Sequence, residues 1–251
     1  MKNEVIPDFS STKLSKDIAR KHGLQILCED GPLIALNKPA GLLTQGVSGG
    51  QSSLEGLVKA YFRDRDSKPG NVYLGVPHRL DRPVSGVLVF AKNSKSAARL
   101  AEQFRDRSVK KEYLAVTEHV PAPRQGRLTD WLLKDAVTAH VRVAVPATVG
   151  AKEARLDYEV LAVKKGCALL KIEIHTGRMH QIRVQLASRG WFVVGDEQYG
   201  AQTPFHENPA EQTSPIALHA FRLGLYHPIR YQPVWLEAPL PENWSHFGFN
   251  Q

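Results

Sequence analysis

The stretch His78-Arg79-Leu80-Asp81-Arg82-Pro83-Val84-Ser85-Gly86 is followed directly by the apolar run Val87-Leu88-Val89-Phe90-Ala91. A continuous apolar run of this kind predicts a buried strand, so we expect Asp81 on a turn that leads into the core. The arginines on either side of Asp81 favour its charged form. A fixed, ionised carboxylate beside cations suits nucleophilic or base chemistry. Taken alone, however, such an aspartate is more often a salt-bridged loop residue.

The length and composition of the chain indicate an ordinary globular protein. It has 251 residues, of which 42% are hydrophobic and 23% charged, so one large domain or two small ones can form. No apolar run reaches the roughly 18 residues of a membrane helix, and residues 1–22 lack the apolar core of a signal peptide. Cys28 and Cys167 lie far apart, which argues against a disulfide framework or a zinc site and predicts a cytoplasmic protein.

The charge of the chain favours a polyanionic partner. The formal net charge is +8 and the sequence pI is about 9.5. A basic balance points most simply to nucleic acid. The basic residues also cluster, at 63–68, 105–111 and 178–189. Each cluster taken alone is by default a solvated face, so other features of the sequence have to decide.

Local patterns predict more strands than helices. Asp30-Gly31 between two apolar runs predicts a hairpin of residues 24–28 and 33–37. Helices are predicted from Ser52 to about Arg65 with a Ser52/Glu55 capping box, from Ser94 to about Arg105, and from near Arg178 to just before Gly190. Further strands are predicted at 109–117, 127–133, 137–145, 155–164, 167–175, 217–226 and 230–237. This order favours an α+β fold, a largely antiparallel mixed sheet with packed helices, over the regular alternation of a Rossmann fold.

The expected domain organisation is simple. Residues 1–23 are predicted to be an N-terminal arm that is disordered or loosely docked. Residues 24–245 are predicted to form a single domain. The polar stretch 201–215 contains two prolines and is predicted to be a long surface loop, a type of loop that is often functional.

Four segments of the sequence stand out together. They are Leu36-Asn37-Lys38-Pro39-Ala40-Gly41-Leu42-Leu43, the Asp81 stretch, Lys110-Lys111-Glu112-Tyr113-Leu114-Ala115, and Thr176-Gly177-Arg178-Met179-His180-Gln181-Ile182-Arg183 with the following Gly195-Asp196-Glu197-Gln198-Tyr199-Gly200. In this order and spacing they closely resemble the RluA-type family of RNA pseudouridine synthases, over roughly residues 24 to 240.

The resemblance implies a fold and an activity. The fold is the pseudouridine synthase catalytic fold with a central active-site cleft, and the activity is the isomerisation of specific uridines to pseudouridine in structured RNA, either ribosomal or transfer RNA. Because the reaction is neither a redox step nor a hydrolysis, the resemblance implies no cofactor and no metal. Asp81 matches the family's essential aspartate. It either attacks the ribose or removes the 2′ proton, and the sequence does not choose between these.

The resemblance also assigns roles to other residues. Tyr113 matches an active-site tyrosine that stacks on the flipped uracil, with its hydroxyl near the departing carbon-5 proton. Arg183 matches a basic residue that pairs with the aspartate, a bidentate role that suits arginine better than lysine. Arg79 matches an arginine that fills the space left by the flipped base. Without the resemblance, Tyr113 would be taken as a core residue and Arg183 as a surface helix arginine.

Six further basic residues are also predicted to bind RNA. His78, Arg178 and His180 fit the motifs and either support the structure or touch phosphate. The cluster of Arg105, Arg107 and Lys110 precedes Tyr113 and is predicted to border the cleft.

The sequence departs from the family pattern at two points. Val84 replaces a hydroxyl residue that is often found there, and residues 1–23 are too few for the small RNA-binding domain that many relatives carry upstream.

The main alternative to an RNA pseudouridine synthase is a non-catalytic RNA-binding or folding protein on the same scaffold, although such a protein would not need Asp81, Tyr113 and Arg183. A hydrolase would ordinarily need a second carboxylate near Asp81, and the segment has none. A monomer is the default expectation.

Overall fold

The computed structural model describes residues 13–46, 50–67, 69–205 and 214–249. The chain divides into two compact units. Unit 1 comprises residues 1–110 and 220–239, and unit 2 comprises residues 111–219 and 240–251. The single domain predicted over residues 24–245 stays a prediction.

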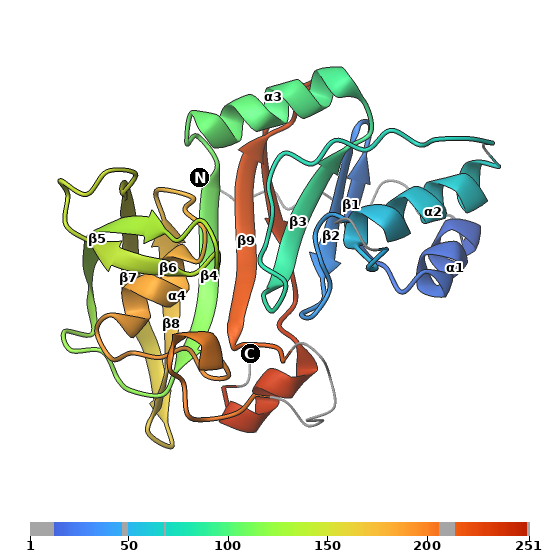
Figure 1. Ribbon diagram of the computed structural model, residues 1–251. Coiled ribbons are helices and arrows are strands. Elements are labelled where there is room, and N and C mark those ends of the chain that lie inside the picture. Colours follow the sequence, from blue (N-terminus) through green and yellow to red (C-terminus); the bar gives the residue numbers. More distant parts are fainter. Residues whose placement is uncertain (1–12, 47–49, 68, 206–213, 250–251) are drawn as a thin grey trace. The chain divides into compact units, whose positions relative to one another are not determined.

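Unit 1 is built on strands in the order β1-β2-β3-β9 (Figure 1), and β10 also pairs with β9. The pairs β1–β2, β2–β3 and β9–β10 are antiparallel. The strands are β1 (Gln25–Asp30), β2 (Leu33–Lys38), β3 (Ser85–Ala91), β9 (Leu218–Tyr226, which enters this unit at Ala220) and β10 (Pro233–Glu237). The helices are α1 (Lys13–Lys21), α2 (Leu54–Asp66) and α3 (Ser94–Arg105). The hairpin predicted around Asp30-Gly31 is confirmed by the antiparallel pairing of β1 with β2. Buried apolar side chains of these strands pack with Leu100 of α3 to form the core of this unit.

The helices of unit 1 begin where side chains can cap them. Asn93 caps α3, because its Oδ1 accepts a hydrogen bond of 2.9 Å from Ser96 N. The capping box predicted for α2 is wrong by one residue: Ser53, not Ser52, accepts from Gly56 N. With Ser53 as the cap, Glu55 comes one position too early to close a box, and it pairs instead with Lys59 one turn along.

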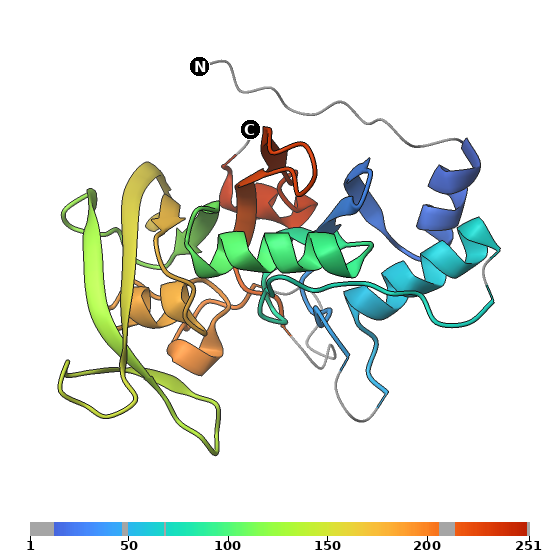
Figure 2. The same ribbon diagram turned by 90° about the horizontal axis from the view of Figure 1, so that it is seen from above.

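The N-terminal helix α1 lies beside α2 in both views (Figures 1 and 2). Lys21 Nζ and His22 Nε2 each lie 2.9 Å from Asp64 Oδ2 of α2. The predicted N-terminal arm therefore contains a helix, and Lys21 and His22 at its end bind α2 through Asp64. The rest of the arm, residues 1–12, lies outside the described residues.

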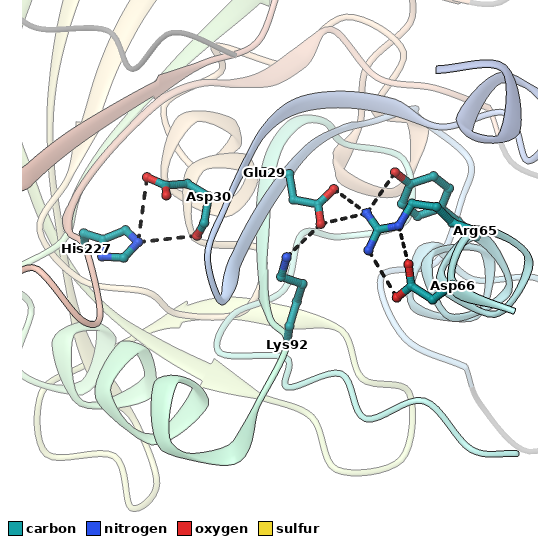
Figure 3. A network of polar contacts seen from close by, with 7 residues as sticks. Glu29, Asp30, Arg65, Asp66, Lys92 and His227 are labelled. Carbon is teal, nitrogen blue, oxygen red and sulfur yellow. Dashed lines mark hydrogen bonds and ion pairs between the residues drawn. The ribbon is translucent and has the colours of Figure 1, made fainter. Parts of the chain in front are cut away.

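A polar network ties α2 to the strands of unit 1 (Figure 3). Glu29 of β1 is only 6% exposed, and its carboxylate accepts hydrogen bonds of 2.9 Å from Arg65 and 2.7 Å from Lys92. Arg65 also binds the neighbouring Asp66. Because Lys92 directly follows β3, the network joins the last turn of α2 to two strands. Arg65, predicted as part of a basic cluster, is therefore a structural residue.

Unit 2 contains a second run of antiparallel strands, in the order β4-β8-β7-β5-β6. These strands are β4 (Lys110–Thr117), β5 (Gln125–Lys134), β6 (Val141–Ala144), β7 (Lys152–Lys164) and β8 (Cys167–Ile174). Helix α4 (Gln181–Ala187) and the short 3-10 helices η1 (Glu197–Tyr199) and η2 (Glu242–Phe247) complete the unit. Val184 of α4 packs with Leu132, Val141 and Ala154 of the sheet. The predicted α+β class with a largely antiparallel sheet is confirmed.

Two predicted elements of unit 2 are shorter than expected, because side chains bind the backbone at their ends. The strand predicted at 137–145 spans only Val141–Ala144, since the Asp135 carboxylate accepts hydrogen bonds from the backbone N–H groups of Val137 and Thr138. The helix predicted from Arg178 begins at Gln181, whose Oε1 accepts from Arg178 N.

The surface loop predicted at 201–215 is described only in part. Residues 206–213 lie outside the described residues. Phe205 is buried and stacks on Phe247 of η2 with ring centroids 5.3 Å apart, so the first part of the stretch is packed. None of the described helices is long and apolar enough to cross a membrane.

Candidate active site

Asp81 lies on the loop that leads into β3 and is half-buried, as the sequence predicts. The loop is closed by a hydrogen bond of 3.1 Å from Val84 N to Asp81 O. Burial lowers the pKa of Lys38, and the Asp81 carboxylate is close enough to that lysine to oppose part of the shift. Asp81 is therefore held on a short, structured turn rather than on a long loop.

Residues 38–44, which are most of the first sequence segment and the adjoining Thr44, bind the Asp81 loop on both sides. On the C-terminal side, Gly41 N donates to Arg82 O at 2.8 Å and Arg82 Nε donates to Gly41 O at 2.9 Å. On the N-terminal side, Thr44 Oγ1 donates to Leu80 O at 2.8 Å and accepts from Leu80 N at 3.1 Å. Both neighbours of Asp81 are thus fixed to one segment.

Lys38, at the end of β2, lies beneath this loop. Its side chain is fully buried, and its Nζ donates to the carbonyl oxygens of Pro39 and Leu42 at 2.8 Å and of Arg82 at 3.2 Å. Burial lowers the pKa of Lys38 to about 7, the Asp81 carboxylate opposes this shift, and the Arg82 charge adds to it. Lys38 was not among the predicted site residues. The sequence feature that could have identified it is the position of a lysine at the end of the apolar run 33–36.

Two further residues fix the start of β3. Gly86 has φ +119°, and a Cβ there would lie 2.2 Å from Ala220 O of β9, so only glycine fits. His78 Nε2 accepts a hydrogen bond of 3.0 Å from Val89 N, and its ring stacks on Phe104 with centroids 4.4 Å apart. These contacts favour the structural role predicted as one option for His78. Arg79, in contrast, is exposed.

Tyr113 and Arg183 belong to unit 2, whereas Asp81 belongs to unit 1, so the structure describes them separately. Tyr113 lies in β4 opposite Ile172 of β8, which in turn lies opposite Tyr158 of β7. Residues directly opposite each other share a face of the sheet. Tyr113 is half-buried on that face.

Arg183 is buried in α4, where its guanidinium group is held from several sides. Its Nε and Nη2 each donate to Asp196 at 2.7 Å, and Nη2 also donates to Gln198 at 2.8 Å. The guanidinium carbon lies 4.8 Å above the centre of the Tyr199 ring. Asp196, Gln198 and Tyr199 were not predicted as partners of Arg183, although they lie in a quoted segment. The predicted pairing of Arg183 with Asp81 stays a prediction.

The loop before α4 is bound to β7. Thr176 Oγ1 donates to Gln181 Oε1 at 2.7 Å and accepts from Arg155 N at 2.9 Å. Arg178 Nε donates to Glu153 O at 2.9 Å. His180 has a left-handed backbone, and its Nδ1 lies 2.7 Å from the Tyr199 hydroxyl. These contacts favour structural roles for Arg178 and His180, and their contact with phosphate stays a prediction.

The predicted RNA-binding cluster of Arg105, Arg107 and Lys110 is exposed at the end of α3 and the start of β4. The contacts of Arg105 to Glu102 and Asp106 are long, at 4.0 Å and 3.7 Å, and its side chain is 71% exposed. Such pairs bind weakly and leave the cation available to a polyanion. Within the described part of the chain, no group of three or more His, Cys, Asp or Glu residues is arranged to hold a metal ion.

The family model and the relatives that match this chain carry the same kind of name. A family model described as RNA pseudouridylate synthase matches residues 32–188. Ribosomal large subunit pseudouridine synthase D of Zymomonas mobilis is 32% identical over 224 residues, which cover 88% of this chain and 70% of that protein. An uncharacterized RNA pseudouridine synthase of the same organism is 35% identical over 90% of this chain and 97% of its own length.

Among solved structures, human RNA pseudouridylate synthase domain containing 4 matches with a TM-score of 0.73 and 28% sequence identity, over 93% of each chain.

Proposed function

Because this chain belongs to the RNA pseudouridylate synthase family, and is therefore an isomerase that acts on RNA, we propose that Asp81 is its catalytic carboxylate. The observation that carries the proposal is the fixation of the Asp81 loop: Thr44 binds the backbone of Leu80 and Gly41 N binds the backbone oxygen of Arg82, directly on either side. A catalytic group must be held near its productive geometry, and the fixed backbone on both sides of the half-buried Asp81 supports such a role.

The reaction rearranges bonds without changing the composition of the RNA. The bond between N1 of uracil and C1′ of ribose breaks, the uracil turns, and C5 bonds to C1′. The proton on C5 leaves, and N1 ends protonated. The Asp81 carboxylate assists either by attacking the ribose as a nucleophile or by removing its 2′ proton as a base. Both routes need an ionised carboxylate.

We assign supporting roles to Tyr113, Arg183 and Arg79 on the basis of the family resemblance. Tyr113 provides an aromatic face for the uracil and a hydroxyl for the C5 proton. Arg183 contributes a cation that orients the carboxylate, and Arg79 fills the space of the flipped base. The exposure of Arg79 is compatible with insertion into RNA.

The proposed substrate is structured RNA, with ribosomal RNA first and transfer RNA second, because one matched relative is named for the large ribosomal subunit. The net charge of +8 supports a polyanionic substrate. We further propose that the protein works as a monomer in the cytoplasm, without a metal ion or cofactor.

The test compares Asp81→Asn with Asp17→Asn, a control that changes the same side chain at an exposed site of α1. The substrate is RNA labelled with tritium at carbon 5 of uridine, taken from cells that lack the protein. Asp81→Asn should bind this RNA but release no tritium, whereas Asp17→Asn should match the unmodified protein. Substantial release by Asp81→Asn would disprove the assignment. If the unmodified protein binds RNA without any release, the non-catalytic alternative holds.

A further inference from the structure

Thr44 lies between β2 and α2, and only 2% of its surface is exposed. Its hydroxyl makes two hydrogen bonds to one residue, donating to Leu80 O at 2.8 Å and accepting from Leu80 N at 3.1 Å. Leu80 directly precedes Asp81. A single side-chain oxygen thus satisfies both backbone groups of the residue before the proposed catalytic carboxylate.

Thr44 is itself firmly placed. Thr44 O accepts a hydrogen bond of 3.1 Å from Glu55 N in the first turn of α2, and Leu43 O accepts one of 2.8 Å from Leu54 N. The other end of α2 is held by the bonds of Arg65 to Glu29. The Thr44 hydroxyl therefore connects the Asp81 loop to an anchored helix, and movement of that loop would break buried hydrogen bonds.

We propose that the Thr44 hydroxyl is a positioning group for catalysis: it holds the backbone on the N-terminal side of Asp81, so that the carboxylate stays in reacting geometry. The inference rests on the function proposed for Asp81. On the other side of Asp81, the loop is held by backbone bonds and by charged side chains. The contact made by Thr44, in contrast, can be removed by deleting a neutral hydroxyl, which leaves the charge of the protein unchanged.

The experiment uses Thr44→Val, which keeps the shape and removes the hydroxyl, and Thr44→Ser, which keeps the hydroxyl. The matched control is Thr117→Val, because Thr117 is also fully buried and its Oγ1 donates to a backbone oxygen, that of His119, at 2.8 Å. Tritium release from the labelled RNA is followed with enzyme in excess, well below the unfolding temperature of each variant. The rate at saturating enzyme reports catalysis, and the half-saturating enzyme concentration reports affinity.

We expect Thr44→Val to lower the saturating rate by about tenfold to a hundredfold, since a small misplacement of a catalytic group has effects of this size. Its half-saturating concentration should stay within about twofold of the original. Thr44→Ser should recover most of the rate, and Thr117→Val should lose little. If Thr44→Val does not fold, Thr44→Ala makes the same deletion with less bulk and replaces it.

Three results would overturn the inference: an unchanged saturating rate in a folded variant without the hydroxyl, an equal loss in Thr117→Val, or a loss of affinity alone. Asp81→Asn separates the two proposals. If Asp81→Asn is inactive and Thr44→Val is fully active, only the positioning role fails. If Asp81→Asn is active, the proposed function of Asp81 fails.

Discussion

Replacing Arg183 by methionine should destabilise the protein strongly, because the side chain is one half of a buried ion pair. Arg183 and Asp196 are 4% and 2% exposed and share two hydrogen bonds of 2.7 Å. Removing one partner of such a pair leaves the other charge buried and uncompensated, at a cost of about 3–5 kcal/mol. Arg183→Met should therefore lower the free energy of unfolding by about that amount, a large part of the roughly 5–15 kcal/mol that holds a domain folded.

The double variant Arg183→Met/Asp196→Leu tests the cause of this loss. It removes both charges and should lie within about 2 kcal/mol of the original protein, because apolar replacements of a buried pair are often close to neutral. Arg127→Met is the control, since Arg127 and Asp157 form an ion pair whose side chains are 63% and 38% exposed, and its loss should cost about 1 kcal/mol or less. Urea unfolding followed by tryptophan fluorescence measures all three. The reasoning is refuted if Arg183→Met costs no more than Arg127→Met, or if the double variant loses as much stability as Arg183→Met.

Three other changes have expected outcomes. Gly86→Ala should lower the free energy of unfolding by about 2–6 kcal/mol, because it combines backbone strain with a collision with Ala220. Gly70→Ala, at φ +97° in open space, should lower it by about 1–3 kcal/mol from strain alone. Equal decreases in the melting temperature of the two variants would contradict this. Burial lowers the pKa of Lys38 from 10.5 to about 7, so the unfolded state binds more protons than the folded state between these pH values. The free energy of unfolding should therefore rise with pH in that window, by up to about 1.4 kcal/mol per pH unit more than it does in Lys38→Met. Equal pH slopes of the unfolding free energy in the two proteins would show that Lys38 stays charged. Replacing Arg105, Arg107 and Lys110 together by glutamine should weaken RNA binding and flatten its salt dependence, and an unchanged slope in binding titrations would mean that the cluster is only a solvated face.

The sequence predicts elements whose signals are local. The helix Ser94–Arg105 has the predicted bounds, because its apolar period and Asn93 cap lie within one stretch. The helix predicted to begin near Arg178 begins three residues later, at Gln181, because Gln181 binds Thr176, Arg178 N and the backbone of a distant strand. Local periodicity contains no information about such contacts.

The same difference between local patterns and distant contacts applies to the candidate site. The family resemblance drew attention to Asp81 and Arg183 through their motifs. The partners that hold them could not be predicted, because Thr44 binds a residue 36 positions away and Lys38 binds one 44 positions away. Asp196 lies only 13 positions from Arg183, but a turn and a helix have to fold before the two meet. Tertiary hydrogen bonds of this kind require the three-dimensional structure.

The order of the chain in unit 1 has a consequence for synthesis on the ribosome. In the strand order, β3 is followed by β9, and β9 enters unit 1 only at Ala220, after residues 111–219 have been made. At about 5–20 residues per second, this delay is on the order of ten seconds. During that time β3 pairs with β2 and, at Ala91, with Gly75, but it lacks β9, and an open strand edge readily pairs with other chains. Unit 1 can therefore complete its sheet only after Ala220 emerges and packs on Gly86.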